Sequence, residues 1–222
     1  MSDVVVSDER YQLHVMLLDV SPAPWRRLLI RPETTIDELH RLIQRCMAWD
    51  ERAWHAFRIH VTVQFGRRSG YGGSDPGGTA DTALLHFRLI PGERFCYEYG
   101  DWRCQLRLER IVVVPRPCVW PVCMGGKWGA PPEQSGGGFC YMNCRQRIRY
   151  PTETIELLAD LVDAPLAEPF EDIGQFRARL KNISAWSRWM HFDRCQLNAS
   201  FRSVSLAWDE EREDEISFAI AG

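Results

Sequence analysis

The chain has 222 residues, of which 45% are hydrophobic, with a formal net charge of −3 and a pI near 6.1. This composition predicts a folded protein with a sizeable core, and it excludes extended disorder and a general electrostatic attraction to nucleic acid. The N-terminus lacks the pattern of a signal peptide, and no apolar run is long enough to span a membrane. We therefore expect a cytoplasmic protein with no membrane partner.

The first 65 residues predict the order β-β-α-β. Alternating apolar side chains indicate strands over residues 11–20, 25–30 and 55–65, and the proline-rich turn at 21–24 makes the first two antiparallel. Thr35 and Glu38 have the spacing of a capping box, which predicts a helix from residue 36 with one apolar stripe. We expect an α+β fold in which an antiparallel sheet carries one packed helix, in a β-grasp-like or roll-like arrangement.

The middle of the chain alternates between strand patterns and glycine-rich stretches. Residues 66–81 contain Arg67, Arg68 and Tyr71 as candidate partner contacts, although a solvated surface loop is the simpler interpretation. Residues 83–89, 94–99 and 102–114 read as strands, with a tight turn at Gly100 and Asp101. The prolines and glycines of residues 115–144 predict an irregular path.

The character of the sequence changes after residue 150. Helices are expected over residues 151–162 and 170–183, followed by a hairpin with strands at 201–208 and 216–220. We therefore divide the chain into an α+β core domain over residues 1–150 and a helical extension with a C-terminal hairpin over residues 151–222. The hairpin loop is strongly acidic, for which a solvated loop is the favoured interpretation. The alternative is contact with a basic partner, with four candidate residues: Glu210, Glu211, Glu213 and Asp214.

Several short motifs occur in a fixed order along the chain. They are Pro-x-Pro-Trp-Arg-Arg at 22–27, Ala-Trp at 48–49, Tyr-Glu-Tyr-Gly-Asp-Trp at 97–102 and Pro-Pro-Glu-x-x-Gly-Gly at 131–137. Through these motifs, residues 11–180 resemble the plasmid Ri open-reading-frame-three-like family, some of whose members are labelled transposon passenger or TnpR-like proteins. The resemblance implies a gene carried on a mobile element and brings no established reaction with it.

The resemblance also indicates which positions to consider as binding residues. The motif positions are Trp25, Arg26, Arg27, Asp101, Trp102, Pro131, Pro132 and Glu133. The chain departs from the family pattern where Cys104 replaces a histidine and where Ala130 and Ser135 replace frequent cysteines. Chemistry that depends on those three positions does not carry over to this chain.

Two sets of residues are candidates for metal binding or acid–base catalysis. A zinc site could be built from four cysteines within 27 residues, but their spacing differs from the Cys-x2-Cys of zinc knuckles, which favours reduced thiols: Cys118, Cys123, Cys140 and Cys144. Asp101 could act as a general acid or base, but a turn aspartate more often caps its own backbone, and His40 is most simply a buried polar group. We therefore expect no catalytic residue and no cofactor.

These observations favour a non-enzymatic function. Our first hypothesis is a protein-binding module encoded on a plasmid, transposon or phage, which modulates a host or anti-phage defence complex of the CRISPR type by direct contact. The first alternative is a DNA-associated accessory or processing protein of a transposon, in which Arg26, Arg27, Arg67 and Arg68 contact the nucleic acid. The second alternative is a small metal-dependent enzyme.

Overall fold

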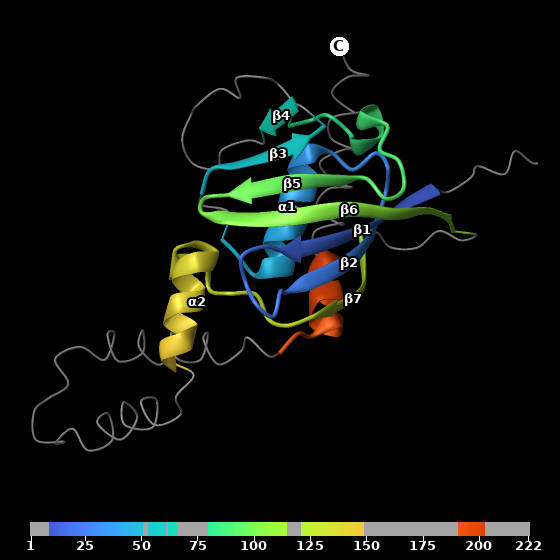
Figure 1. The fold of residues 1–222 in the computed structure, drawn as a ribbon. Coiled ribbons are helices and arrows are strands. Elements are labelled where there is room, and N and C mark those ends of the chain that lie inside the picture. The colour runs from blue at the N-terminus through green and yellow to red at the C-terminus, as the bar shows by residue number, and fades with distance from the viewer. Residues whose placement is uncertain are drawn as a thin grey trace, which may run out of the picture.

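The described part of the chain forms a single antiparallel sheet with helix α1 and the segment 194–202 on one side. The computed structural model describes residues 9–50, 53–60, 62–65, 80–114, 121–148 and 191–202. The seven strands lie in the order β4-β3-β5-β6-β1-β2-β7 (Figure 1). Their bounds are β1 (Glu9–Leu17), β2 (Trp25–Ile30), β3 (His55–Ile59), β4 (Thr62–Phe65), β5 (Arg94–Tyr99), β6 (Trp102–Val113) and β7 (Val122–Lys127).

Two α-helices and two 3-10 turns accompany the sheet. They are α1 (Ile36–Met47), α2 (Gly137–Ile148), η1 (Leu84–Phe87) and η2 (Glu133–Ser135), and a further helical segment covers residues 194–202. Among the described residues, none of the helices has the length and apolar character needed to cross a membrane. The expected α+β fold, an antiparallel sheet with a packed helix, is confirmed.

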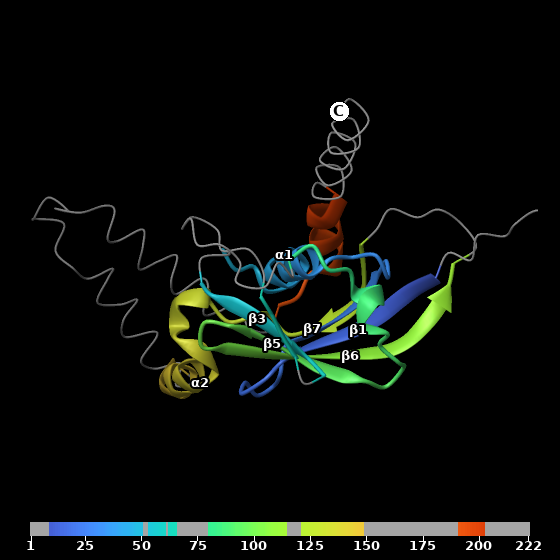
Figure 2. The ribbon, with the colours of Figure 1, turned by 90° about the horizontal axis from the view of Figure 1, so that it is seen from above.

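Helix α1 covers one face of the sheet. Its start is the predicted capping box, in which the Glu38 backbone N–H donates to Thr35 Oγ1 at 3.1 Å and the Thr35 N–H donates to the Glu38 carboxylate at 2.9 Å. The apolar stripe of the helix is fully buried and stabilises the fold by roughly 1.5–3 kcal/mol per side chain. Figure 2 shows α1 and the 194–202 segment on the same side of the sheet, with no described element covering the other side.

Three predictions for the middle of the chain were wrong. Residues 55–65 are not one strand, because His60 adopts a positive φ of 54° and reverses the chain between β3 and β4. Residues 83–89 form η1 instead of a strand, since the Leu84 and Leu85 N–H groups donate to carbonyl oxygens just before α1. Residues 115–144 are not irregular throughout, because they contain β7, which pairs with β2, and helix α2.

The helical segment 194–202 packs against the core. Leu197 and Phe201 are buried one helical turn apart, so Phe201 begins no strand here, in contrast to the predicted hairpin. The Asn198 side chain accepts from the Cys123 N–H at 2.7 Å and donates to the Cys123 carbonyl at 3.1 Å, and thereby occupies the outer edge of β7. The predicted helices over 151–162 and 170–183 and the remainder of the hairpin lie outside the described residues.

An aromatic cluster anchors the segment between β7 and α2. Trp49 stacks between Tyr99 and Trp102, with ring centroids 5.3 and 5.4 Å away. The Trp49 indole N–H donates to the Pro131 carbonyl at 3.1 Å, and the Trp102 indole N–H donates to the Glu133 carbonyl at 3.2 Å. The Glu133 carboxylate in turn accepts hydrogen bonds from the Tyr99 hydroxyl and the Asp50 N–H. This cluster, which we call the Glu133 anchor, joins three separate stretches of the chain, at residues 49–50, 99–102 and 131–133.

Two histidines lie inside the core. The rings of His40 on α1 and His55 on β3 are stacked, with centroids 3.5 Å apart, and both residues are almost fully buried. His40 Nδ1 lies 2.7 Å from the Tyr97 hydroxyl, whereas His55 Nε2 is buried without a hydrogen-bond partner among the described residues. Burial lowers the pKa of His40 to about 2 and that of His55 to about 4, so both rings are neutral in the folded protein.

The histidine pair predicts that the protein loses stability as the pH falls below about 6.5, because the unfolded chain binds protons there and the folded chain does not. Both folded pKa values lie below the unfolded value, so the stabilisation is present above pH ~6.5 and is lost on acidification. From pH 7.5 to 5.5 we expect a loss of roughly 2–3 kcal/mol in the free energy of unfolding, measured by urea titration. His55→Phe keeps a ring against His40 and should about halve the loss; an unchanged pH dependence would contradict this account.

The Glu133 anchor predicts that Glu133→Ala lowers the free energy of unfolding by about 2 kcal/mol, because the partly buried Tyr99 hydroxyl loses a charged acceptor. Glu98→Ala is a suitable control, since Glu98 only pairs with the exposed Arg58 and its loss should cost less than about 1 kcal/mol. Urea unfolding of both variants, followed by tryptophan fluorescence, measures the difference. Equal losses in the two variants would mean that Glu133 does not hold the segment in place.

Candidate functional site

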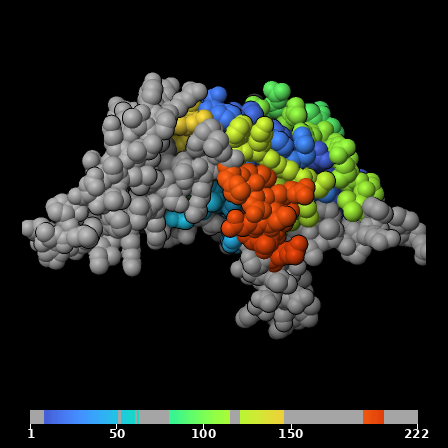
Figure 3. Space-filling view, turned by 90° about the horizontal axis from the view of Figure 1, so that it is seen from below, coloured from blue at the N-terminus to red at the C-terminus, as the bar shows by residue number. Residues whose placement is uncertain are grey.

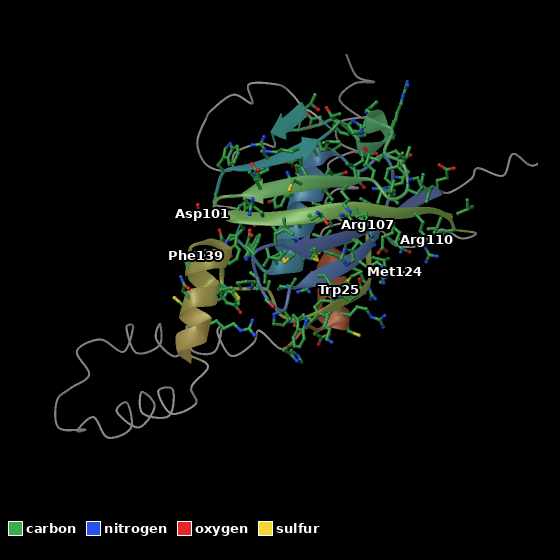
Figure 4. All side chains as sticks on the ribbon, in the orientation of Figure 1. Trp25, Asp101, Arg107, Arg110, Met124 and Phe139 are labelled. Atoms are coloured by element: carbon green, nitrogen blue, oxygen red, sulfur yellow. The ribbon has the colours of Figure 1, made fainter. Side chains whose placement is uncertain are left out.

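The face of the sheet opposite α1, which we call the open face, carries a row of basic side chains. Strand alternation directs every second residue of β1, β2, β5 and β6 away from α1. The register aligns four of these residues directly across neighbouring strands, in the order Arg94, Arg107, His14 and Arg27. Figure 4 looks onto this face and labels Arg107 and Trp25 on it.

Glu109 forms ion pairs with two arginines of this row, Arg27 and Arg107. The register between β1 and β6 shifts at Gln12, which leaves Glu109 without an opposite residue and turns its carboxylate toward the row. Arg27 binds this carboxylate through two hydrogen bonds of 2.6 and 2.9 Å, Gln12 donates to it at 2.6 Å, and Arg107 lies at 3.3 Å. The hydrogen bonds from Arg27, assisted by Gln12 and Arg107, lower the pKa of Glu109 to about 2, although burial opposes the shift.

Trp25 forms the aromatic part of the open face. Its ring stacks on His14 with centroids 5.3 Å apart, and the Arg27 guanidinium carbon lies 5.4 Å from its ring centroid. Burial lowers the pKa of His14, so this ring is neutral at physiological pH. Arg27 is therefore held from two sides, by Glu109 and by Trp25.

Two further ion pairs extend the open face toward its ends. Arg58 on β3 binds Glu98 through hydrogen bonds of 2.9 and 3.3 Å, and Arg103 on β6 binds Asp19 through bonds of 2.9–3.1 Å. Arginine side chains that are already oriented by carboxylates lose little conformational freedom when they bind. The open face thus presents ordered arginines around a tryptophan, a composition typical of the centre of protein interfaces.

The motif positions selected from the sequence fall into three places. Trp25 and Arg27 lie on the open face, and Arg26, between them, is directed to the α1 side and is only 2% exposed. Trp102, Pro131, Pro132 and Glu133 are brought together in the Glu133 anchor. Asp101 is exposed in the β5–β6 turn, where its backbone packs so closely that a Cβ on Gly137 would lie 2.7 Å from the Asp101 carbonyl oxygen.

Other candidates lie apart from these places or outside the described residues. Cys123 is buried in β7, whereas Cys140 and Cys144 are exposed on α2. The part of the chain that the structure describes contains no group of three or more His, Cys, Asp or Glu positioned to hold a metal ion. The remaining candidates lie outside that part: Cys118, Arg67, Arg68, Tyr71, Glu210, Glu211, Glu213 and Asp214.

Sequence reasoning did not identify His14, Arg94, Arg107 and Glu109 as residues of the open face. The alternation of residues 102–108 contains the signal for Arg107, which follows the buried Leu106 and precedes the buried Leu108. Glu109 carries no such signal, because only the bulge opposite Gln12 gives it its place.

Comparisons with known proteins agree with this fold and identify the family. No curated protein matches the sequence. A crystal structure of a protein of unknown function from Methanosarcina mazei Go1 is similar, with 26% identity, a TM-score of 0.53, and coverage of 73% of this chain and 94% of that one. The model of the plasmid pRiA4b ORF-3-like proteins matches residues 9–172. The chain therefore belongs to the plasmid pRiA4b ORF-3-like family.

Proposed function

We propose that this chain is a non-enzymatic protein-binding module encoded on a mobile genetic element, which acts on a host or anti-phage defence complex by direct contact through the open face. The observation that carries the proposal is the cluster of Trp25, Arg27 and Glu109 on a sheet face that no described element covers. Tryptophan and arginine are the residues most enriched at interface hot spots. The mobile-element part rests on the plasmid origin in the family description.

The charge balance of the open face favours a protein partner over nucleic acid. Arg27, Arg58 and Arg103 each already bind a carboxylate of this chain. A surface that binds nucleic acid needs cationic side chains that displace the condensed counterions from the phosphates. Carboxylates within the same surface oppose this displacement. A protein partner with both charged and apolar groups fits a mixed surface of this kind, because complementary charges there set orientation and specificity.

The location of His14, His40 and His55 supports a non-enzymatic role. His40 and His55 are 4% and 3% exposed, so a substrate cannot reach them without unfolding of the core. His14 is accessible, but its ring is stacked on Trp25 and its neighbours are basic. An acid–base mechanism requires a titratable group within hydrogen-bond reach of a bound substrate. These three rings instead pack against other aromatic rings.

The proposal predicts that Trp25→Ala greatly reduces the recovery of a specific protein from a lysate of a natural host. The full chain, Trp25→Ala and Arg107→Ala are used as bait, and bound proteins and nucleic acid are quantified in parallel by mass spectrometry and absorbance. We expect Trp25→Ala to lower recovery about tenfold or more and Arg107→Ala to lower it about threefold, as for an aromatic anchor and a partly exposed charged contact.

Arg41→Ala is the matched control. Arg41 lies on α1 and pairs with Asp37 at 2.8 Å. Its side chain is 35% exposed, close to the 41% of Arg107, so Arg41→Ala removes a similar ion pair on the opposite side of the sheet. This variant should retain the partner fully. A partner retained equally by Trp25→Ala would refute the proposal. So would recovery of nucleic acid alone, with affinity falling by about three orders of magnitude between roughly 50 and 200 mM salt.

A further inference from the structure

A pocket lies on the α1 side of the sheet, away from the open face. It is bounded by the C-terminal end of α1, the segment 129–132 and the helical segment 194–202, and its volume is about 480 Å³. Figure 3 shows the 194–202 segment, in orange, against the yellow-green residues of β7. Met47, Pro131, Phe192 and Leu197 give the pocket largely apolar walls. Its volume is within the range of roughly 300–1,000 Å³ that is usual for small-molecule sites.

A buried arginine forms part of the pocket wall. Arg26 is 2% exposed; its Nε donates to the Cys46 carbonyl at 3.2 Å, and its Nη1 lies 2.8–3.1 Å from the carbonyls of Trp25, Lys127 and Trp128. Phe192 covers one side of the guanidinium, with its ring centroid 4.0 Å from Cζ. Phe192 can lie there because residue 126 is glycine, whose Cβ would be 2.6 Å from the ring.

The positive charge of Arg26 has no anionic partner within the described part of the chain. Carbonyl oxygens satisfy Nε and Nη1, while Nη2 makes no hydrogen bond to a described residue. The C-terminus of α1 supplies only about half a negative charge, so a net positive charge remains in an apolar wall. An arginine cannot lose its proton to avoid this cost, and a buried charge without a counter-ion is strongly unfavourable.

The other charged groups at the pocket do not compensate Arg26. Arg45, in the last turn of α1, adds a second positive charge at the exposed rim. Asp193 also lies at the rim, where its carboxylate accepts the Gln196 backbone N–H at 3.0 Å at the start of the helical segment. The pocket therefore combines an apolar interior with a deep positive charge that a ligand can neutralise.

We propose that this pocket binds a small organic monocarboxylate, whose carboxylate pairs with Arg26 and whose apolar body lies against Pro131, Phe192 and Leu197. One free guanidinium nitrogen suits a singly charged carboxylate. A phosphate dianion would need more donors than these apolar walls offer, because its desolvation would be largely uncompensated. This binding site is independent of the open face and of any protein partner there.

The test uses benzoate as the carboxylate and benzyl alcohol as its neutral match, with the full chain in isothermal titration calorimetry. We expect saturable binding of benzoate with a Kd on the order of 1 mM or tighter, and binding of benzyl alcohol about tenfold weaker or more. Arg26→Gln should weaken benzoate binding about tenfold, and Arg45→Gln, at the exposed rim, about threefold.

Ser200→Trp provides a test that does not depend on Arg26. Ser200 lines the pocket from the helical segment, so a tryptophan there fills the pocket and should abolish benzoate binding while leaving the circular dichroism spectrum unchanged. If Arg26→Gln does not fold, Ser200→Trp still tests whether benzoate binds in this pocket. The proposal is overturned if the unmodified chain shows no saturable binding up to about 10 mM benzoate, if benzyl alcohol binds equally well, or if Ser200→Trp binds benzoate as before.

Discussion

The burial of one face of the sheet under α1 is the constraint on which the rest of this molecule depends. Because successive residues of a strand point to opposite faces, covering one face assigns every strand residue to the core or to the open face. The consequence is clearest at the turn into β2, where Trp25, Arg26 and Arg27 follow one another. Arg26 is enclosed behind the sheet, and its two neighbours become part of an ordered surface in front of it.

Buried ionisable side chains in the interior differ in their charge state. His40 and His55 avoid charge, because burial lowers both pKa values far below neutrality. Arg26 keeps its charge, since a guanidinium remains protonated, and it is held by backbone carbonyls and by Phe192. The first arrangement links stability to pH. The second leaves a charge facing a pocket, which gives the pocket its preference for an anion.

The motifs that identify the family divide between structure and surface. Trp102, Pro131 and Glu133 act within the Glu133 anchor, where indole and carboxylate groups hold the segment 128–136 against the sheet. Trp25 and Arg27 face outward beside Glu109. The motif positions of this chain thus combine residues that maintain the fold with residues on the open face, and membership of the family does not separate them.

The sequence by itself determined the local elements whose signals are contained within a few residues. The capping box at Thr35 fixed the start of α1, and alternation fixed β2, β5 and β6, because hydrogen bonds and side-chain periodicity there are local. The reversal at His60 is local, but it lacks the glycine or asparagine that usually marks a tight turn. Only the tertiary structure decided the fate of Leu84 and Glu109, since the hydrogen bonds of η1 to residues 32–34 and the bulge opposite Gln12 depend on parts of the chain that are distant in sequence. The same holds for Arg26: its position in the sequence resembles that of Arg27, but the cover of α1 and Phe192 makes one a buried charge and the other a surface contact.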